Sequence, residues 1–286
     1  MAKSSLGMWL AGARPRTLPA AIAPVLVATA LAGDSFNPLT ALLALIVSLS
    51  LQIGVNYAND YSDGIRGTDN DRIGPSRITA GGLAKPVQVK SAAFISFSVA
   101  AVAGLGLAMT TSWWLIAVGA ISIAAAWGYT GGKNPYGYMG LGELFVFIFF
   151  GLIATVGSFY VQAEEITGKS ILAGVIVGSL ACAILVINNV RDRAKDEVAG
   201  KLTLAVRLGD KRSRIIYTVL VIAPYLLTAG FGTPWTLLTL LTLPMTLSIL
   251  KALRSGIQGV DLIALLGRTG KLQMLFSLAL SLALII

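Results

Sequence analysis

The 286-residue chain contains no histidine and only one cysteine. The lack of histidine excludes Ser-His-Asp and Cys-His catalysis, HExxH zinc sites and histidine-ligated haem. Cys182 lies within an apolar run and has no second cysteine with which to form an intrachain disulfide. Any chemistry must therefore use carboxylates, amides, tyrosines, lysines and arginines, together with a metal ion that such groups can bind.

Charged residues are scarce as well. They make up 12% of the chain, against roughly 25% in a typical soluble domain, whereas hydrophobic residues make up 56%. This composition predicts an all-α membrane protein, because helices satisfy their own backbone hydrogen bonds in lipid. The net charge of +9 would suggest a nucleic-acid partner in a soluble protein, so the position of the basic residues becomes important.

Apolar stretches of 15–21 residues recur along the whole chain. Some are shorter than the roughly 20 residues that cross a bilayer core, so we expect flanking residues to extend them. No linker or low-complexity segment separates them, and residues 1–286 are expected to form one membrane domain. The sequence predicts nine transmembrane helices, at 18–32, 39–58, 91–109, 113–129, 141–161, 171–187, 215–231, 235–250 and 272–286.

The connections between these stretches alternate in charge. Those at 33–38, 110–112, 162–170 and 232–234 are short and nearly free of lysine and arginine, whereas the other four are long and basic. If the N-terminus is cytoplasmic, 21 of the 22 basic residues lie on the cytoplasmic side, with Lys169 as the exception. The positive-inside rule therefore predicts a cytoplasmic N-terminus. It also explains the basic charge without a nucleic-acid partner.

Two groups of acidic and amide side chains lie at the cytoplasmic ends of the second and sixth predicted spans. Spacings of three or four residues place the members of each group on one face of a helix. A single aspartate at a helix end is usually a solvated interfacial residue, but asparagines within a span are costly and tend to be functional. The two groups comprise Asn56, Asp60 and Asp63, and Asn188, Asp192 and Asp196.

Two facing groups of carboxylates would repel each other unless cations neutralised them. Mg²⁺ prefers oxygen ligands and commonly combines a few carboxylates with phosphate oxygens of a substrate. The sequence therefore predicts that these six residues hold two Mg²⁺ ions on a diphosphate, which the metal ions would stabilise as a leaving group.

Basic residues near both groups are candidates for binding the diphosphate. Positive-inside topology alone would also place basic residues here, and Arg14 is equally a membrane anchor. Glu143 begins the fifth predicted span, where the helix dipole favours a carboxylate, and we expect no catalytic role for it. The basic candidates are Arg14, Arg72, Arg77, Lys133 and Lys201.

Four long segments resemble the UbiA superfamily of intramembrane prenyltransferases, and within it the 1,4-dihydroxy-2-naphthoate prenyltransferases of menaquinone biosynthesis. The resemblance implies nine helices around a central chamber, two aspartate-rich motifs on the second and sixth helices, and a hydrogen bond from Tyr129 near the diphosphate. The segments are ARPRTLPAAIAPVL (13–26), NDYSDGIRGTDNDRIGPSRITAGG (59–82), YTGGKNPYGYMGLGELFVFIFFG (129–151) and INNVRDRAKDEVAGKLTLAVRLG (187–209).

The resemblance also implies a reaction. A polyprenyl group would pass from polyprenyl diphosphate to 1,4-dihydroxy-2-naphthoate, with loss of diphosphate and CO₂, giving demethylmenaquinone. The enzyme would lie in the bacterial cytoplasmic membrane, with its active site on the cytoplasmic side and its product released into lipid. A sister enzyme using 4-hydroxybenzoate and a membrane cation transporter stay open as alternatives. The sequence indicates neither the prenyl chain length, nor a base, nor the oligomeric state.

Overall fold

The computed structural model describes residues 5–68 and 77–286, and every regular element in these ranges is helical. The α-helices are α1 (Ser5–Ala13), α2 (Pro19–Ala32), α3 (Pro38–Arg66), α4 (Pro86–Thr110), α5 (Leu115–Gly128), α6 (Gly142–Val146), α7 (Ala154–Ala163), α8 (Gly168–Val198), α9 (Leu204–Leu227), α10 (Leu243–Arg254) and α11 (Asp261–Ile285). Short 3₁₀ segments are η1 (Pro15–Thr17), η2 (Gly33–Ser35), η3 (Tyr136–Tyr138), η5 (Thr228–Phe231) and η6 (Pro234–Thr242), and η4 (Phe147–Ile153) is a π-helix.

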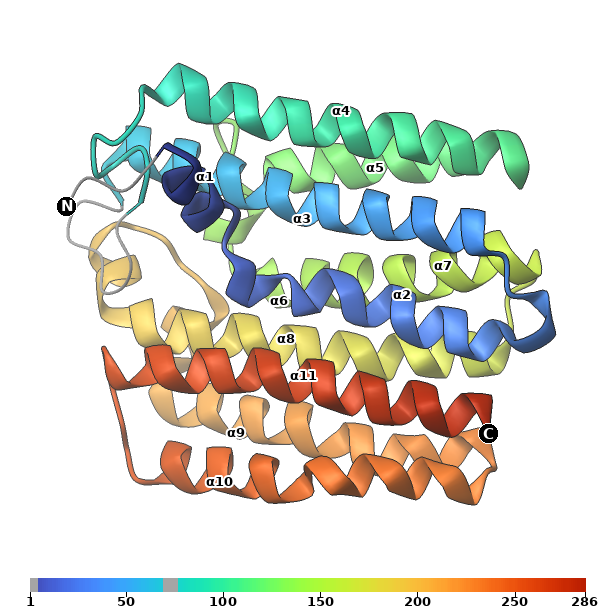
Figure 1. Cartoon of the computed structure of the whole chain (residues 1–286). Coiled ribbons are helices and arrows are strands. Elements are labelled where there is room, and N and C mark those ends of the chain that lie inside the picture. The colour runs from blue at the N-terminus through green and yellow to red at the C-terminus, as the bar shows by residue number, and fades with distance from the viewer. Residues whose placement is uncertain (1–4, 69–76) are drawn as a thin grey trace.

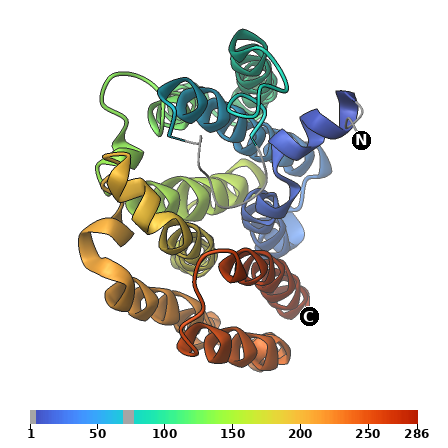
Figure 2. The same ribbon diagram turned by 90° about the vertical axis from the view of Figure 1, so that its left-hand side faces the viewer.

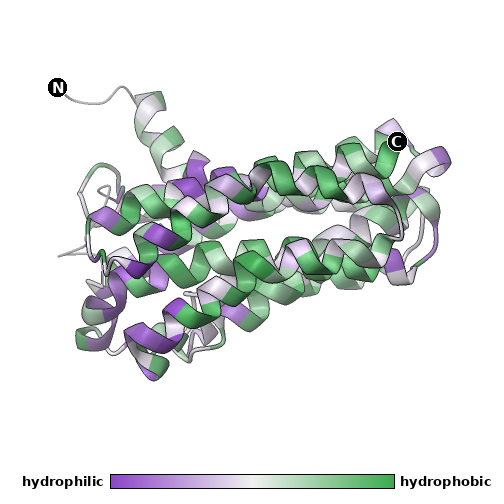
Figure 3. Ribbon diagram, turned by 90° about the horizontal axis from the view of Figure 1, so that it is seen from below, coloured by the Kyte–Doolittle hydropathy of each residue, from purple (hydrophilic) through white to green (hydrophobic). Residues whose placement is uncertain are grey.

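The long helices run side by side along one axis, with the two chain ends at opposite ends of the bundle (Figure 1). Seen along that axis, α3, α4 and α5 lie on one side and α9, α10 and α11 on the other, with α7 and α8 between them (Figure 2). Hydrophobic residues cover the middle of the bundle, and hydrophilic residues gather most densely at the end near the N-terminus (Figure 3). That end is the one for which the sequence predicts a cytoplasmic position.

The nine predicted spans each overlap a helical segment of the structure. Six helical segments of the described chain are long and apolar enough to cross a membrane unaided. A seventh arises if the helices on either side of Leu18, which are bent by 54°, form one broken span. The fold is thus that of a helical integral membrane protein with about six or seven such spans. The count of nine stays a prediction.

Capping residues set the limits of the two helices that carry the acidic motifs. Asn37 accepts hydrogen bonds from the backbone N–H groups of Leu39 and Thr40, which begins α3, and Gly67 ends it in the left-handed region with φ 76°. Thr167 and Ser170 cap the start of α8 reciprocally. Both helices continue beyond the predicted spans, which ended at 58 and 187, so both acidic motifs are held on rigid helix.

Helix α8 is the central element of the bundle. Its most apolar segment is 78% buried, whereas the corresponding segment of α3 is 28% buried. Glycines let α8 approach the π-helix η4 closely: a Cβ atom at Gly178 would lie 2.9 Å from the Cα atom of Gly151. Small residues at such contacts allow membrane helices to pack backbone to backbone.

We expect Gly178→Ala to lower the thermal stability of the purified protein. The added methyl group would meet backbone atoms that cannot rotate away, and overpacking of this kind typically costs about 1–3 kcal/mol. Gly168→Ala is the matched control on the same helix, because a Cβ atom there meets nothing within 4 Å. Equal melting temperatures for the two variants would contradict this close contact.

Candidate active site

One elongated cavity of about 310 Å³ runs through the bundle and brings the two acidic motifs together. Its polar end is lined by residues of α3 and α8, although these helices lie more than a hundred positions apart in the sequence. Such a volume is within the usual range for ligand-binding cavities. Of the predicted site residues, the lining includes Arg14, Asn56, Asp63, Arg77, Tyr129, Asn188, Asp192, Asp196 and Lys201.

Asp63 faces this cavity from the last turns of α3. Its Oδ1 atom accepts a hydrogen bond of 2.7 Å from the hydroxyl of Tyr138, and its Oδ2 atom lies 3.9 Å from the Nζ atom of Lys201. Asn59, one helical turn earlier, also lines the cavity and accepts a hydrogen bond of 2.7 Å from the hydroxyl of Thr130. The face presented to the cavity therefore includes Asn59 and Asp63.

Asp60 lies elsewhere, contrary to the expectation that it shares the cavity face with Asn56 and Asp63. Its two carboxylate oxygens accept hydrogen bonds of 2.9 Å and 2.8 Å from the backbone N–H groups of Ile78 and Thr79. The residue is 1% exposed and is absent from the cavity lining. Consecutive helical residues point about 100° apart, so Asn59 takes the place that the sequence analysis gave to Asp60.

Asn56 lies deeper along α3 and joins this helix to the N-terminal segment. Its Nδ2 atom donates to the backbone carbonyl of Ala13 at 2.9 Å and to the hydroxyl of Thr17 at 3.0 Å. Arg14 in turn donates to the backbone carbonyl of Asn56 at 3.2 Å. These contacts hold the break between α1 and α2 against the cavity wall, and a metal-binding role for Asn56 stays a prediction.

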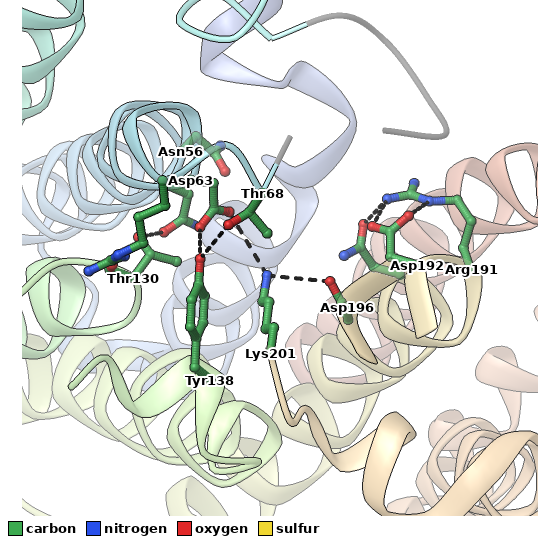
Figure 4. Close-up of polar contacts among 12 residues, drawn as sticks. Asn56, Asp63, Thr68, Thr130, Tyr138, Arg191, Asp192, Asp196 and Lys201 are labelled. Carbon is green, nitrogen blue, oxygen red and sulfur yellow. Dashed lines mark hydrogen bonds and ion pairs between the residues drawn. The ribbon is translucent and has the colours of Figure 1, made fainter. Parts of the chain in front are cut away.

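The second motif presents Asn188, Asp192 and Asp196 to the same cavity. Arg191 pairs with Asp192 through two contacts, Nε to Oδ1 at 2.7 Å and Nη2 to Oδ2 at 2.5 Å, and also donates to Oδ1 of Asn188 at 2.9 Å. Lys201 lies between the motifs, with Nζ 3.9 Å from Asp63 and 4.0 Å from Asp196 (Figure 4). Two cations therefore offset the negative charge of the facing carboxylates.

The six residues predicted to bind the diphosphate divide into three groups. Arg14, Arg77, Tyr129 and Lys201 line the cavity. Lys133 is exposed on the turn after α5 and does not contribute to the lining, so the structure does not bring it to the site. Arg72 lies outside the described residues.

Tyr138 is a site residue that the sequence analysis missed, although it lies in the third of the four resembling segments. Its hydroxyl donates to Asp63, and the Nζ atom of Lys201 lies 5.2 Å from the centre of its ring. Burial, and then the charge of Asp63, raise the pKa of Tyr138 well above its usual range. The phenol therefore remains a hydrogen-bond donor to Asp63 at all physiological pH values.

The rest of the cavity is mostly apolar. It extends along α3 from Asp63 to Ala44, a distance of about 28 Å at 1.5 Å per residue. The π-helix η4 contributes Phe149, Phe150 and Ile153 to its wall, and Gly119 and Gly157 leave open space beside α5 and α7. A long hydrocarbon with an anionic head group matches this combination of a polar end and an apolar chamber.

The polar end also suits a hard divalent cation. Within residues 5–68 and 77–286 no three acidic or thiol side chains gather into a ready-made metal site. The carboxylate and amide oxygens instead come from two helices facing one cavity. Mg²⁺ characteristically completes such a partial set with water and with phosphate oxygens of a substrate. The donor set therefore fits Mg²⁺ bound together with a diphosphate.

Comparison with known proteins gives a consistent assignment. Residues 21–259 match the model of the UbiA prenyltransferase family. The 1,4-dihydroxy-2-naphthoate octaprenyltransferase of Mycobacterium tuberculosis is 49% identical over 96% of this chain and 96% of the relative, and that of Escherichia coli is 39% identical over 92% and 90%. The 2-carboxy-1,4-naphthoquinone phytyltransferase of Synechocystis is 30% identical over 85% and 81%.

Solved structures share the fold at low sequence identity. A UbiA homolog from Archaeoglobus fulgidus bound to GPP and Mg²⁺ superposes with a TM-score of 0.67 at 15% identity, over 97% of this chain and 99% of that one. A digeranylgeranylglyceryl phosphate synthase superposes with a TM-score of 0.62 at 18% identity, over 98% of both chains. These similarities establish the fold of the bundle.

The contacts of Asp60 and Asp63 predict different effects of replacing each residue. Asp60→Ala would leave one buried and one partly buried backbone N–H group without partners, at a cost of about 1–3 kcal/mol for the buried one, and should lower the melting temperature. Asp63→Ala should lower the melting temperature less, because Tyr138 and Lys201 keep Thr68 and Asp196 as partners, and should weaken Mn²⁺ binding measured by electron paramagnetic resonance. If Asp60→Ala lost Mn²⁺ binding at unchanged stability, Asp60 would be a metal ligand after all.

Proposed function

The chain belongs to the UbiA prenyltransferase family, and from this premise we propose that it transfers a polyprenyl group from polyprenyl diphosphate to 1,4-dihydroxy-2-naphthoate. The observation that carries the proposal is the single cavity in which two acidic motifs and several cations meet one end of a long apolar chamber. The acceptor is supported by relatives at 39–49% identity that are named 1,4-dihydroxy-2-naphthoate octaprenyltransferases.

The reaction balances without a separate base. The bond between the first prenyl carbon and the diphosphate oxygen breaks, and a new carbon–carbon bond forms at the ring carbon that carries the carboxylate. The bond to the carboxylate then breaks, CO₂ leaves, and its electron pair restores the aromatic ring. The product is demethylmenaquinone in its reduced, quinol form, and no proton needs to be removed from the acceptor overall.

The two acidic motifs would hold Mg²⁺ together with the diphosphate. Asp63, Asp192 and Asp196 offer carboxylate oxygens, and Asn59 and Asn188 offer amide oxygens, all from the lining of the same cavity. When bound, Mg²⁺ would offset the negative charge that develops on the departing diphosphate. Asn56 lines the same cavity and stays a predicted ligand, whereas Asp60, also predicted, accepts hydrogen bonds from Ile78 and Thr79 outside the lining.

Residues of the chain would perform three further tasks. Lys201, Arg77 and Arg14 supply positive charge at the polar end and would bind the diphosphate oxygens. Tyr138 holds Asp63 in place through its hydroxyl. The chamber beyond, walled by Phe149 and its neighbours, would enclose the prenyl chain and keep water from the allylic cation.

The predicted membrane arrangement is part of this proposal. We propose one prenyltransferase domain over residues 1–286 with nine membrane spans and a cytoplasmic N-terminus in the bacterial cytoplasmic membrane. Hydrophilic residues concentrate at the end of the bundle that carries both acidic motifs, which supports an active site on the cytoplasmic side (Figure 3). The apolar chamber and the hydrophobic outer surface suit a product that leaves into lipid.

Purified protein in detergent or lipid should convert octaprenyl diphosphate and 1,4-dihydroxy-2-naphthoate into diphosphate, CO₂ and a prenylated naphthoquinol when Mg²⁺ is present. EDTA should abolish the reaction, and Asp63→Ala should lower its rate roughly 10²-fold or more, as loss of a charge-stabilising group typically does. Chromatography of the product and release of labelled CO₂ provide the measurement. Asp34→Ala, at an exposed position in η2, is the control.

Two results would contradict this proposal in different ways. Prenylation of 4-hydroxybenzoate but not of the naphthoate would leave the enzyme class intact and overturn the acceptor. No turnover with either acceptor, from protein shown to be folded, would contradict prenyl transfer and favour the alternative of cation transport.

The proposed position of the prenyl chain predicts a change in chain-length selectivity. Gly119 lines the apolar chamber with nothing within 4 Å of a Cβ atom built on it, so Gly119→Leu would place a side chain in the open space. We expect kcat/KM for octaprenyl diphosphate to fall about tenfold while that for geranyl diphosphate changes little, because only the longer chain reaches this depth. Ala120→Leu, at the exposed neighbouring position, is the control. Equal losses with both donors would show that the prenyl chain does not pass Gly119.

A further inference from the structure

A partly buried carboxyl group lies behind the cavity wall and does not itself line the cavity. Glu143 lies in the first turn of α6, and its Oε1 atom accepts a hydrogen bond of 2.9 Å from Nδ2 of Asn189. Its Oε2 atom is buried and has no hydrogen-bond partner among the described residues. The thiol of Cys182 donates to the backbone carbonyl of Glu143 at 3.2 Å and fixes the start of α6 against α8.

The contact with Glu143 determines how Asn189 presents its amide. The NH₂ group of Asn189 donates to the carboxyl group of Glu143, so the carbonyl oxygen of Asn189 points the other way. Asn189 is 4% exposed and lines the cavity. No residue within 5–68 and 77–286 donates a hydrogen bond to this carbonyl oxygen. Asn189 therefore lines the cavity with its amide orientation fixed from behind by Glu143.

Asn189 lies where the polar end of the cavity meets the apolar chamber. Asn188 and Asp192 of the second acidic motif are its neighbours on α8, and Tyr129 lines the same region from the end of α5. A Cβ atom at Gly142 would lie 3.4 Å from the hydroxyl of Tyr129, which places Tyr129 against the start of α6. An aromatic acceptor must reach this boundary to meet the first carbon of the prenyl chain.

We propose that Glu143 is a positioning residue for the aromatic acceptor, holding Asn189 so that the carbonyl oxygen of Asn189 receives the hydrogen of a ring hydroxyl. This inference rests on the proposed function. As the new carbon–carbon bond forms, positive charge spreads onto that hydroxyl, and the hydrogen bond to Asn189 becomes stronger. Asn189 takes no proton, in keeping with a reaction in which the departing CO₂ supplies the electron pair.

The first test replaces the carboxylate with an amide of the same shape. In Glu143→Gln the group facing Asn189 can donate as well as accept, so Asn189 is free to turn its NH₂ group into the cavity. We expect KM for 1,4-dihydroxy-2-naphthoate to rise about tenfold, while KM for octaprenyl diphosphate and the affinity for Mn²⁺ stay within about twofold of the wild-type values. Glu165→Gln, at an exposed position between α7 and α8, is the matched control.

A reciprocal exchange separates this role from a merely structural one. Asn189→Asp alone would place two carboxylates against each other and should also impair acceptor binding. In the double variant Glu143→Gln, Asn189→Asp, the amide introduced at position 143 can donate to the carboxylate introduced at position 189, whose second oxygen again faces the cavity. We expect the acceptor KM of the double variant to return to within about threefold of the wild-type value.

An acceptor analogue that lacks one ring hydroxyl identifies the group contacted. Affinities are measured in EDTA, where no turnover occurs, from the fluorescence of each naphthoate. Wild-type protein should bind 1,4-dihydroxy-2-naphthoate more tightly than one of its two monohydroxy analogues by about tenfold, and Glu143→Gln should lose this discrimination.

Three results would overturn the inference. Glu143→Gln could leave the acceptor affinity unchanged, or could lower the donor and acceptor affinities equally. The acceptor KM of the double variant could also fail to recover although that variant melts at the wild-type temperature. If wild-type protein and Glu165→Gln neither bound nor prenylated the naphthoate, the proposed function itself would be wrong, and the inference with it.

Discussion

Lys201 lies between Asp63 of α3 and Asp196 of α8, with its Nζ atom 3.9 Å and 4.0 Å from their carboxylate oxygens. The rest of the site depends on this neutralisation, because facing carboxylates at the end of a largely apolar bundle would repel each other. Arg191 has the same effect on Asp192 through two short contacts. The cations that neutralise these carboxylates are thus held next to the groups that a metal–diphosphate complex would engage.

Helix α8 contributes both to the acidic end of the cavity and to its apolar wall. Glycines along its buried segment let η4 approach closely, and its last turns carry Asn188, Asp192 and Asp196 into the cavity. Because η4 and α6 belong to one continuous helical segment, the same packing brings Glu143 to within 2.9 Å of Asn189. The cavity is therefore graded along its length. Charged residues gather at one end and mostly apolar walls follow, which suits a diphosphate at the charged end and a prenyl chain along the rest.

The sequence by itself determined the class of structure and most of the polar site. A composition with 12% charged residues indicates a protein in lipid, where helices make their backbone hydrogen bonds internally. The recurring apolar stretches indicate where those helices lie. Spacings of three and four residues placed Asp63, Asn188, Asp192 and Asp196 on helical faces, and all four line the cavity. These inferences hold because hydrophobicity and helical periodicity are local properties, which can be read without knowledge of contacts between distant segments.

Only the tertiary structure decided which polar side chains line the cavity and which contact other segments of the chain. On α3 the periodicity admitted both Asn59 and Asp60, and the choice came from the backbone N–H groups of Ile78 and Thr79, which engage Asp60. Glu143 was indistinguishable in sequence from a carboxylate that stabilises a helix N-terminus, and its contact with Asn189 spans 46 positions. A hydrogen bond between distant segments depends on how helices pack and rotate against one another. That rotation is set by close contacts such as Gly151 with Gly178, and the local sequence pattern does not contain it.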